Sequence, residues 1–66
     1  MNDEAFNISI RKFLKVVGVS SQREIEQAVA KAIADGESGT SFPVTMTLRM
    51  PALKLDVSFD GRIDIA

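Results

Sequence analysis

The sequence has no cysteine, histidine, tryptophan or tyrosine among its 66 residues. Without cysteine there is no disulfide, no thiolate nucleophile and no cysteine-based metal site. Without histidine, the chain lacks the commonest general base and the commonest transition-metal ligand. Its serine hydroxyls therefore have no histidine to activate them, and every lysine falls on a face predicted to be solvated. We expect no catalytic residue and no cofactor.

Long apolar runs are also missing. Stretches such as Ala28–Ala30 are far too short to cross a membrane. The first residues, Met1–Glu4, are acidic and do not look like a signal peptide. A chain this short leaves little room for an internal cavity of about 300 Å³, so we expect no small-molecule ligand.

The composition is that of an ordinary globular domain. Hydrophobic residues make up 45% and charged residues 26%, with a formal net charge of −1. Disordered chains have fewer apolar residues and a larger net charge. We therefore expect one small folded domain over residues 1–66.

The N-terminal third has the apolar spacing of an amphipathic helix. Phe6, Ile10 and Val17 fall on one stripe, which predicts a helix over about residues 3–17. Gly18 is typical of the residue that follows a helix C-terminus. We expect the first helix to end there.

A second helix is predicted over about residues 22–35. Ile25 and Val29 again follow helical spacing. Ser21 and Glu24 have the spacing of a capping box at the start, and Gly36 is typical of the position after the end.

Beyond this segment the period changes to two. Turn-forming residues at 36–43 predict a loop, and alternating apolar and polar residues predict strands over about 44–50, 53–59 and 62–65. Alternation with one apolar face is typical of an antiparallel sheet that has one wet face.

Two hairpin turns connect these predicted strands. Pairing Leu48 with Leu55 keeps the apolar residues on one face and leaves a loop over Met50–Leu53. For the second hairpin we favour a three-residue loop, Phe59–Gly61, with its glycine in the left-handed conformation. A two-residue turn at Asp60-Gly61 is the alternative, although it mixes the two faces.

The expected fold is therefore α+β, a two-layer ααβββ arrangement. Two amphipathic helices pack on one face of a three-stranded antiparallel meander. Folding of so short a chain leaves only a few kcal/mol of net stability, which association would raise.

Acidic residues recur at Asp56, Asp60 and Asp64. In the favoured register Asp56 directly faces Asp64, and paired carboxylates attract hard cations. Calcium needs six to eight oxygen ligands, however, and Arg49 and Lys54 lie near enough to neutralise Asp56. We interpret this group as a solvated, ion-paired surface and expect no metal site.

The function favoured by these observations is a small, non-enzymatic protein-interaction module that binds another protein or itself. Its expected contact surface is either the outer edge of the first strand, which exposes unpaired backbone groups, or the side of the first helix that carries Ile8. The candidate residues are Ile8, Arg11, Lys12, Lys15, Thr45, Thr47 and Arg49.

The alternative is a weak nucleic-acid or anionic-surface binder that uses Arg11, Lys12 and Lys15, with Arg23 as a further candidate. A sequence pI of about 5.2 and the absence of aromatic residues suited to base stacking disfavour it.

The segments Ser9–Lys15 and Gly18–Glu26, together with Asp60-Gly61, are similar to a family of small, uncharacterised proteobacterial proteins of unknown function. The resemblance covers nearly the whole chain. It implies a bacterial, cytoplasmic protein and supports the two predicted helices. It assigns no catalytic or binding residue.

Overall fold

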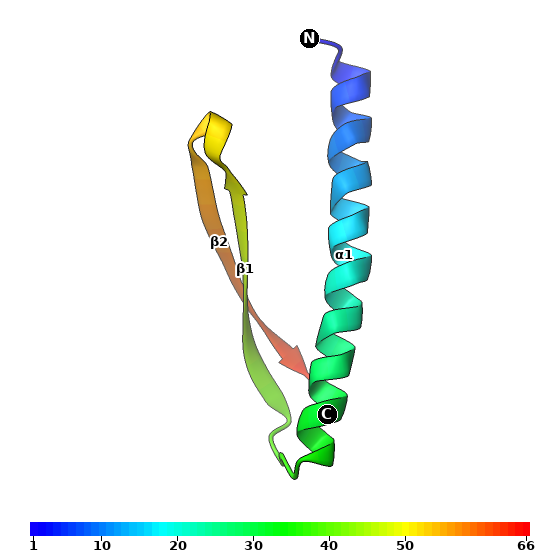
Figure 1. Cartoon of the computed structure of the whole chain (residues 1–66), viewed down its shortest axis with the longest axis vertical. Coiled ribbons are helices and arrows are strands. Elements are labelled where there is room, and N and C mark those ends of the chain that lie inside the picture. The colour runs from blue at the N-terminus through cyan, green and yellow to red at the C-terminus, as the bar shows by residue number, and fades with distance from the viewer.

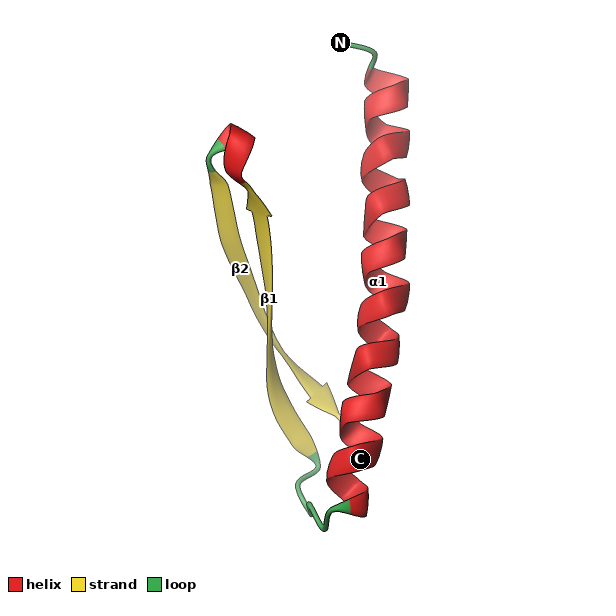
Figure 2. Cartoon of the chain, in the orientation of Figure 1, coloured by secondary structure: helices red, strands yellow, loops and turns green.

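The computed structural model describes all residues 1–66 and contains one long helix and one long β-hairpin (Figures 1 and 2). Helix α1 (Asp3–Ala34) leads to strand β1 (Ser41–Met50), a short 3-10 turn η1 (Pro51–Leu53) and strand β2 (Leu55–Asp64). The molecule is elongated, measuring 51 × 21 × 17 Å. The chain thus combines helix and sheet, but the predicted ααβββ arrangement is wrong.

Helix α1 runs without a break through the turn predicted after Gly18. Gly18 does not have a positive φ, and a glycine inside a helix costs only about 1 kcal/mol relative to alanine. The half-buried residues Val17, Ser21 and Ile25 follow one another at four-residue spacing across the predicted break. The two predicted helices, 3–17 and 22–35, are therefore one helix, and its half-buried positions keep the same helical spacing on both sides of Gly18.

The two ends of the helix agree with the sequence. The Asn2 side chain accepts a hydrogen bond of 3.0 Å from the backbone N–H of Ala5, which caps the first turn. At the other end, Gly36 has a φ of 96° and takes the left-handed conformation that glycine favours. The Glu37 carboxylate then accepts N–H bonds from Ser38 and Gly39. This tight turn lets β1 begin at Ser41, inside the predicted loop 36–43.

The hairpin forms a two-stranded antiparallel sheet. Leu48 lies opposite Val57 instead of Leu55, a shift of two residues that keeps the same side chains on the same face. The turn is closed by Met50 and Leu55, and Lys54 takes a left-handed φ of 54°. The turn therefore lies one residue later than the predicted loop.

The predicted third strand, 62–65, is the second half of β2. Because β1 begins at Ser41, it supplies partners as far as Asp64, and Gly61 lies in the ladder opposite Val44. Gly61 has no positive φ, so the predicted loop over Phe59–Gly61 is wrong.

The predicted packing of two helices on a three-stranded sheet is also wrong, because the chain has one helix and two strands and no residue between them is buried. Figure 1 shows the hairpin running alongside α1, converging on it near the C-terminal end of the helix and standing apart from it near the hairpin tip.

Candidate functional site

The two faces of the hairpin differ completely in chemistry. Residues directly opposite each other in an antiparallel pair project from the same face. The register therefore gathers every large apolar side chain of both strands on one face: Phe42, Val44, Met46, Leu48, Met50, Leu55, Val57, Phe59 and Ile63. We call this row the apolar face and its reverse the polar face.

The polar face is held by contacts between the strands. Hydroxyl groups donate to carboxylates or to each other, and one ion pair lies near the tip. The pairs are Ser41–Asp64 at 2.6 Å, Thr45–Asp60 at 2.9 Å, Thr47–Ser58 at 3.1 Å and Arg49–Asp56 at 3.6 Å. The polar groups have partners within the hairpin, and this face is suited to solvent.

The acidic residues of β2 do not converge. Asp56 was predicted to face Asp64, but the two lie on the same strand and pair with Arg49 and Ser41 respectively. The structure contains no group of three or more acidic side chains that could hold a metal ion. The proximity predicted for Asp56 and Asp64 is therefore wrong.

Helix α1 turns an apolar stripe toward the hairpin. Its members recur three or four residues apart, the spacing of one helix face, except across Ser21, where the step is eight. They are Phe6, Ile10, Leu14, Val17, Ile25, Ala28 and Ala32. No helix here combines the length and apolar character that crossing a bilayer requires.

The stripe and the apolar face enclose an open space that we call the inner groove. Near the C-terminal end of α1 a cavity of about 260 Å³ lies between Ile25 and Phe42. A larger cavity of about 550 Å³ lies between Phe13 and Met50, toward the hairpin tip. The side chain of Phe13, on the groove wall, remains 55% exposed.

The exposed area is large for the size of the chain. A compact protein of 7.2 kDa exposes about 4,100 Å² by the usual scaling with mass, whereas this chain exposes 5900 Å². The excess is about 1,800 Å² per chain. The elongated monomer therefore leaves unburied an area, apolar and polar together, that a compact fold covers.

The residues predicted for partner contact fall into two separate groups. Ile8, Arg11, Lys12 and Lys15 are exposed along the N-terminal half of α1, and none of these three cations forms an ion pair. Thr45, Thr47 and Arg49 lie on the polar face, each paired with a residue of β2. The structure does not bring the two groups together.

Sequence reasoning missed the inner groove because it treated the same apolar residues as a closed core. The signal was present in the helix. Its apolar stripe continues in phase from Phe6 to Ala32, about 39 Å at 1.5 Å per residue. A ten-residue strand spans only about 33 Å, so one hairpin cannot cover the stripe completely.

The comparisons with known proteins agree with the resemblance seen in the sequence. No curated protein and no solved structure is detectably similar to the chain. One family description, "Family of unknown function (DUF6494)", matches residues 1–66. The chain therefore belongs to this family of unknown function, DUF6494, over its whole length.

Proposed function

We propose that the chain is a small, non-enzymatic protein-interaction module whose inner groove is covered by another protein chain. One observation carries this proposal: apolar residues line both walls of the groove, yet no residue of the chain is buried. Apolar area removed from water stabilises a protein by about 25 cal/mol per Å². A partner that covers the groove supplies the core that the chain lacks alone. The cytoplasm, implied by the family resemblance, is the proposed location.

The shape of the groove favours a protein over a small ligand. Its apolar lining extends from Phe6 near the start of α1 to Ala32 near its end. Polar groups that would orient a small molecule are scarce, since Ser9 and Arg49 are the only polar residues among those lining the two cavities. Extended apolar surfaces of this kind are typical of interfaces between chains.

The proposal is tested with one charged residue placed inside the groove and the same residue placed outside it. Leu14→Asp puts a carboxylate on the groove wall, and Ala30→Asp puts one on the opposite side of α1. Each tagged variant is captured from cells that also make the untagged chain, and the chains that co-purify are identified by mass. We expect Leu14→Asp to lose a partner that the wild type and Ala30→Asp retain. A wild-type chain that is folded, monomeric and without partners contradicts the proposal.

Arg11, Lys12 and Lys15 support a second candidate function, weak binding to nucleic acid or another anionic surface, because none of them is neutralised by an ion pair. Phosphate contacts release counterions, so such binding weakens steeply as salt increases. Binding that is unchanged between about 50 and 200 mM salt excludes this function.

A further inference from the structure

We propose that the chain closing the inner groove is a second copy of this chain, which joins it along the β2 side as an antiparallel dimer with two-fold symmetry. Strand β2 pairs with β2 of the second copy, and one flank of α1 packs against the same flank of the other helix. This inference rests on the proposed function and identifies its partner.

The excess exposed area of the chain is of the size that a homodimer interface buries. If the dimer covers the excess of about 1,800 Å² on each chain, its interface totals about 3,600 Å². Obligate homodimer interfaces bury about 2,000–5,000 Å². A hairpin of two strands is also marginal alone and needs further strands or close packing against a helix, and in the single chain α1 leaves no residue of the hairpin buried.

The open edge of β2 is suited to pairing. β1 pairs with only one edge of β2, so the backbone groups along the other edge are free to accept another strand. The corresponding edge of β1 is less suitable because Pro43 has no N–H to donate. Symmetric antiparallel pairing of β2 with itself extends the sheet to four strands and keeps both apolar faces on one side.

Charge favours a register centred on Phe59 over one centred on Asp60. Side chains directly opposite each other share a face, so the symmetry axis must pass through a residue pair. An axis at Phe59 places Phe59 against its own copy and Asp56 against Arg62 of the second copy. An axis at Asp60 instead places Asp60 against its own copy, which like charge disfavours. Phe59 is 60% exposed in the single chain and becomes the centre of the new apolar surface.

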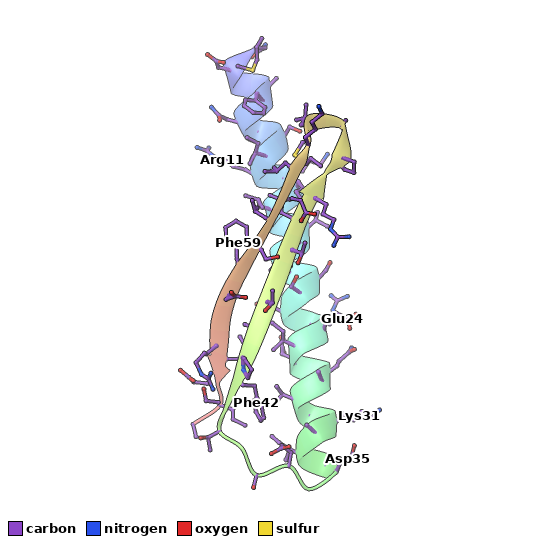
Figure 3. The ribbon with its side chains drawn as sticks, turned by 90° about the vertical axis from the view of Figure 1, so that its left-hand side faces the viewer. Arg11, Glu24, Lys31, Asp35, Phe42 and Phe59 are labelled. Carbon is purple, nitrogen blue, oxygen red and sulfur yellow. The ribbon has the colours of Figure 1, made fainter.

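The flank of α1 on the β2 side has a matching charge pattern. Arg11, Lys15, Gly18, Gln22 and Glu26 recur three or four residues apart and so lie along one flank. Figure 3 shows Arg11 and Phe59 on one side of the molecule, with Glu24 and Lys31 on the other. The Arg11 flank and the open edge of β2 therefore face the same way.

Antiparallel packing of this flank pairs opposite charges. Helix α1 spans Asp3–Ala34, so its midpoint lies beside Gly18. About that point, Arg11 comes opposite Glu26 of the second copy, whereas parallel packing would put Arg11 against Arg11. Gly18 meets its own copy at the axis, where the missing side chain lets the helices approach closely. A Cβ atom at Gly18 would meet nothing within 4 Å in the single chain, so its own fold does not require glycine there.

One symmetry axis satisfies both contacts. Figure 1 shows the middle of β2 level with the middle of α1. The layers also match in width, because four strands span about 19 Å and two helices about 20 Å. The dimer is then a four-stranded sheet with two helices covering its apolar face.

A charge exchange tests the helix contact. Arg11→Glu and Glu26→Arg each place like charges opposite one another twice in the dimer, and each is expected to weaken dimerisation about tenfold by sedimentation. The double variant restores the opposite charges and is expected to return to the wild-type dissociation constant. The matched exchange of Glu24 and Lys31, on the other flank, is expected to change nothing. A double variant as weak as the single variants overturns the antiparallel arrangement.

Cysteine cross-linking tests the same geometry independently, because the native chain contains no cysteine. Lys15→Cys and Gln22→Cys chains, mixed and oxidised, are expected to form the mixed disulfide in preference to either symmetric one. Ser20→Cys on the other flank is the control and is expected to form none. A wild-type chain that is monomeric at millimolar concentration overturns the inference. If that monomer still captures a different protein through Leu14, the proposed function stands; if it captures nothing, both fail.

Discussion

The two faces of the hairpin differ in whether a single chain satisfies their side chains. On the polar face, hydroxyls, carboxylates and one guanidinium have partners across the strands, from Ser41–Asp64 to Arg49–Asp56. On the apolar face, large side chains line a groove that no part of the chain closes. A single chain therefore supplies the partners of the polar face but does not cover the apolar face.

This difference separates two tasks that larger domains perform together. Cross-strand polar contacts help to fix the register of the hairpin, and each pair contributes about 0.2–1 kcal/mol to its stability. Stability on the scale of a folded domain needs buried apolar area. The chain therefore specifies its local shape internally, and in the proposed dimer association supplies the buried apolar area.

The largest effect is expected from a carboxylate placed on each face at neighbouring positions of β1. Met46→Asp puts a charge on the apolar face, whereas Thr47→Asp puts it on the polar face. If the apolar face is covered in the working protein, an unpaired charge there costs several kcal/mol and abolishes cooperative unfolding. Thr47→Asp is expected to cost less than about 1 kcal/mol. Both are measured by urea unfolding followed by circular dichroism.

Equal, small effects at Met46 and Thr47 would show that water reaches the apolar face in solution. The dependence of the unfolding midpoint on protein concentration then shows whether the chain is a dimer or a monomer. A dimer unfolds at a higher temperature as concentration rises, and a monomer does not.

The sequence predicted which residues share a face better than it predicted where elements end. The apolar alternation of β1 and β2 was assigned to the correct face, because a register error of two residues leaves every side chain on its side. The helix start at Asn2 and its end before Gly36 were also predicted correctly. These features depend on local chemistry, namely capping and the left-handed conformation.

Two other glycines misled the prediction for one shared reason. Gly18 and Gly61 were taken as breaks, yet each lies inside a repeat that continues in phase on both sides. A glycine that preserves phase weakens an element by about 1 kcal/mol or less without ending it. The inner groove could not be predicted from the sequence, because apolar residues in a closed core and apolar residues that line an open groove follow the same sequence pattern.

The next effect concerns the most connected residue of the polar face. The Ser41 hydroxyl donates to Asp64 and accepts a 3.0 Å hydrogen bond from Nε of Arg62. Ser41→Ala removes both contacts at the open end of the hairpin and is expected to cost about 1 kcal/mol of unfolding free energy. Ser38→Ala, in the preceding turn, is the control. A cost no greater than that of the control would mean that solvent replaces these contacts fully.

A smaller effect of opposite sign is expected where the apolar face has a gap. Gly61 is extended, and a Cβ atom there would meet Cγ1 of Val44 at 3.7 Å, an ordinary contact. Gly61→Val is therefore expected to stabilise the hairpin by about 0.5 kcal/mol, through strand preference and lower entropy of the unfolded chain. Gly36→Val is the contrasting variant, because its φ of 96° strains any side chain. If Gly61→Val instead lowers the unfolding temperature, the result would support the loop over Phe59–Gly61 that was predicted from the sequence.

The smallest effect is expected at the ion pair of the polar face. Arg49 and Asp56 lie 3.6 Å apart, but their side chains are 71% and 67% exposed. Solvent screening and side-chain entropy limit such a pair to below about 0.5 kcal/mol. A double-mutant cycle with Arg49→Ala and Asp56→Ala measures their coupling at low and high salt. Coupling above about 1 kcal/mol that persists in high salt would mean that a partner excludes water from this pair, and the polar face, too, would then be incomplete in a single chain.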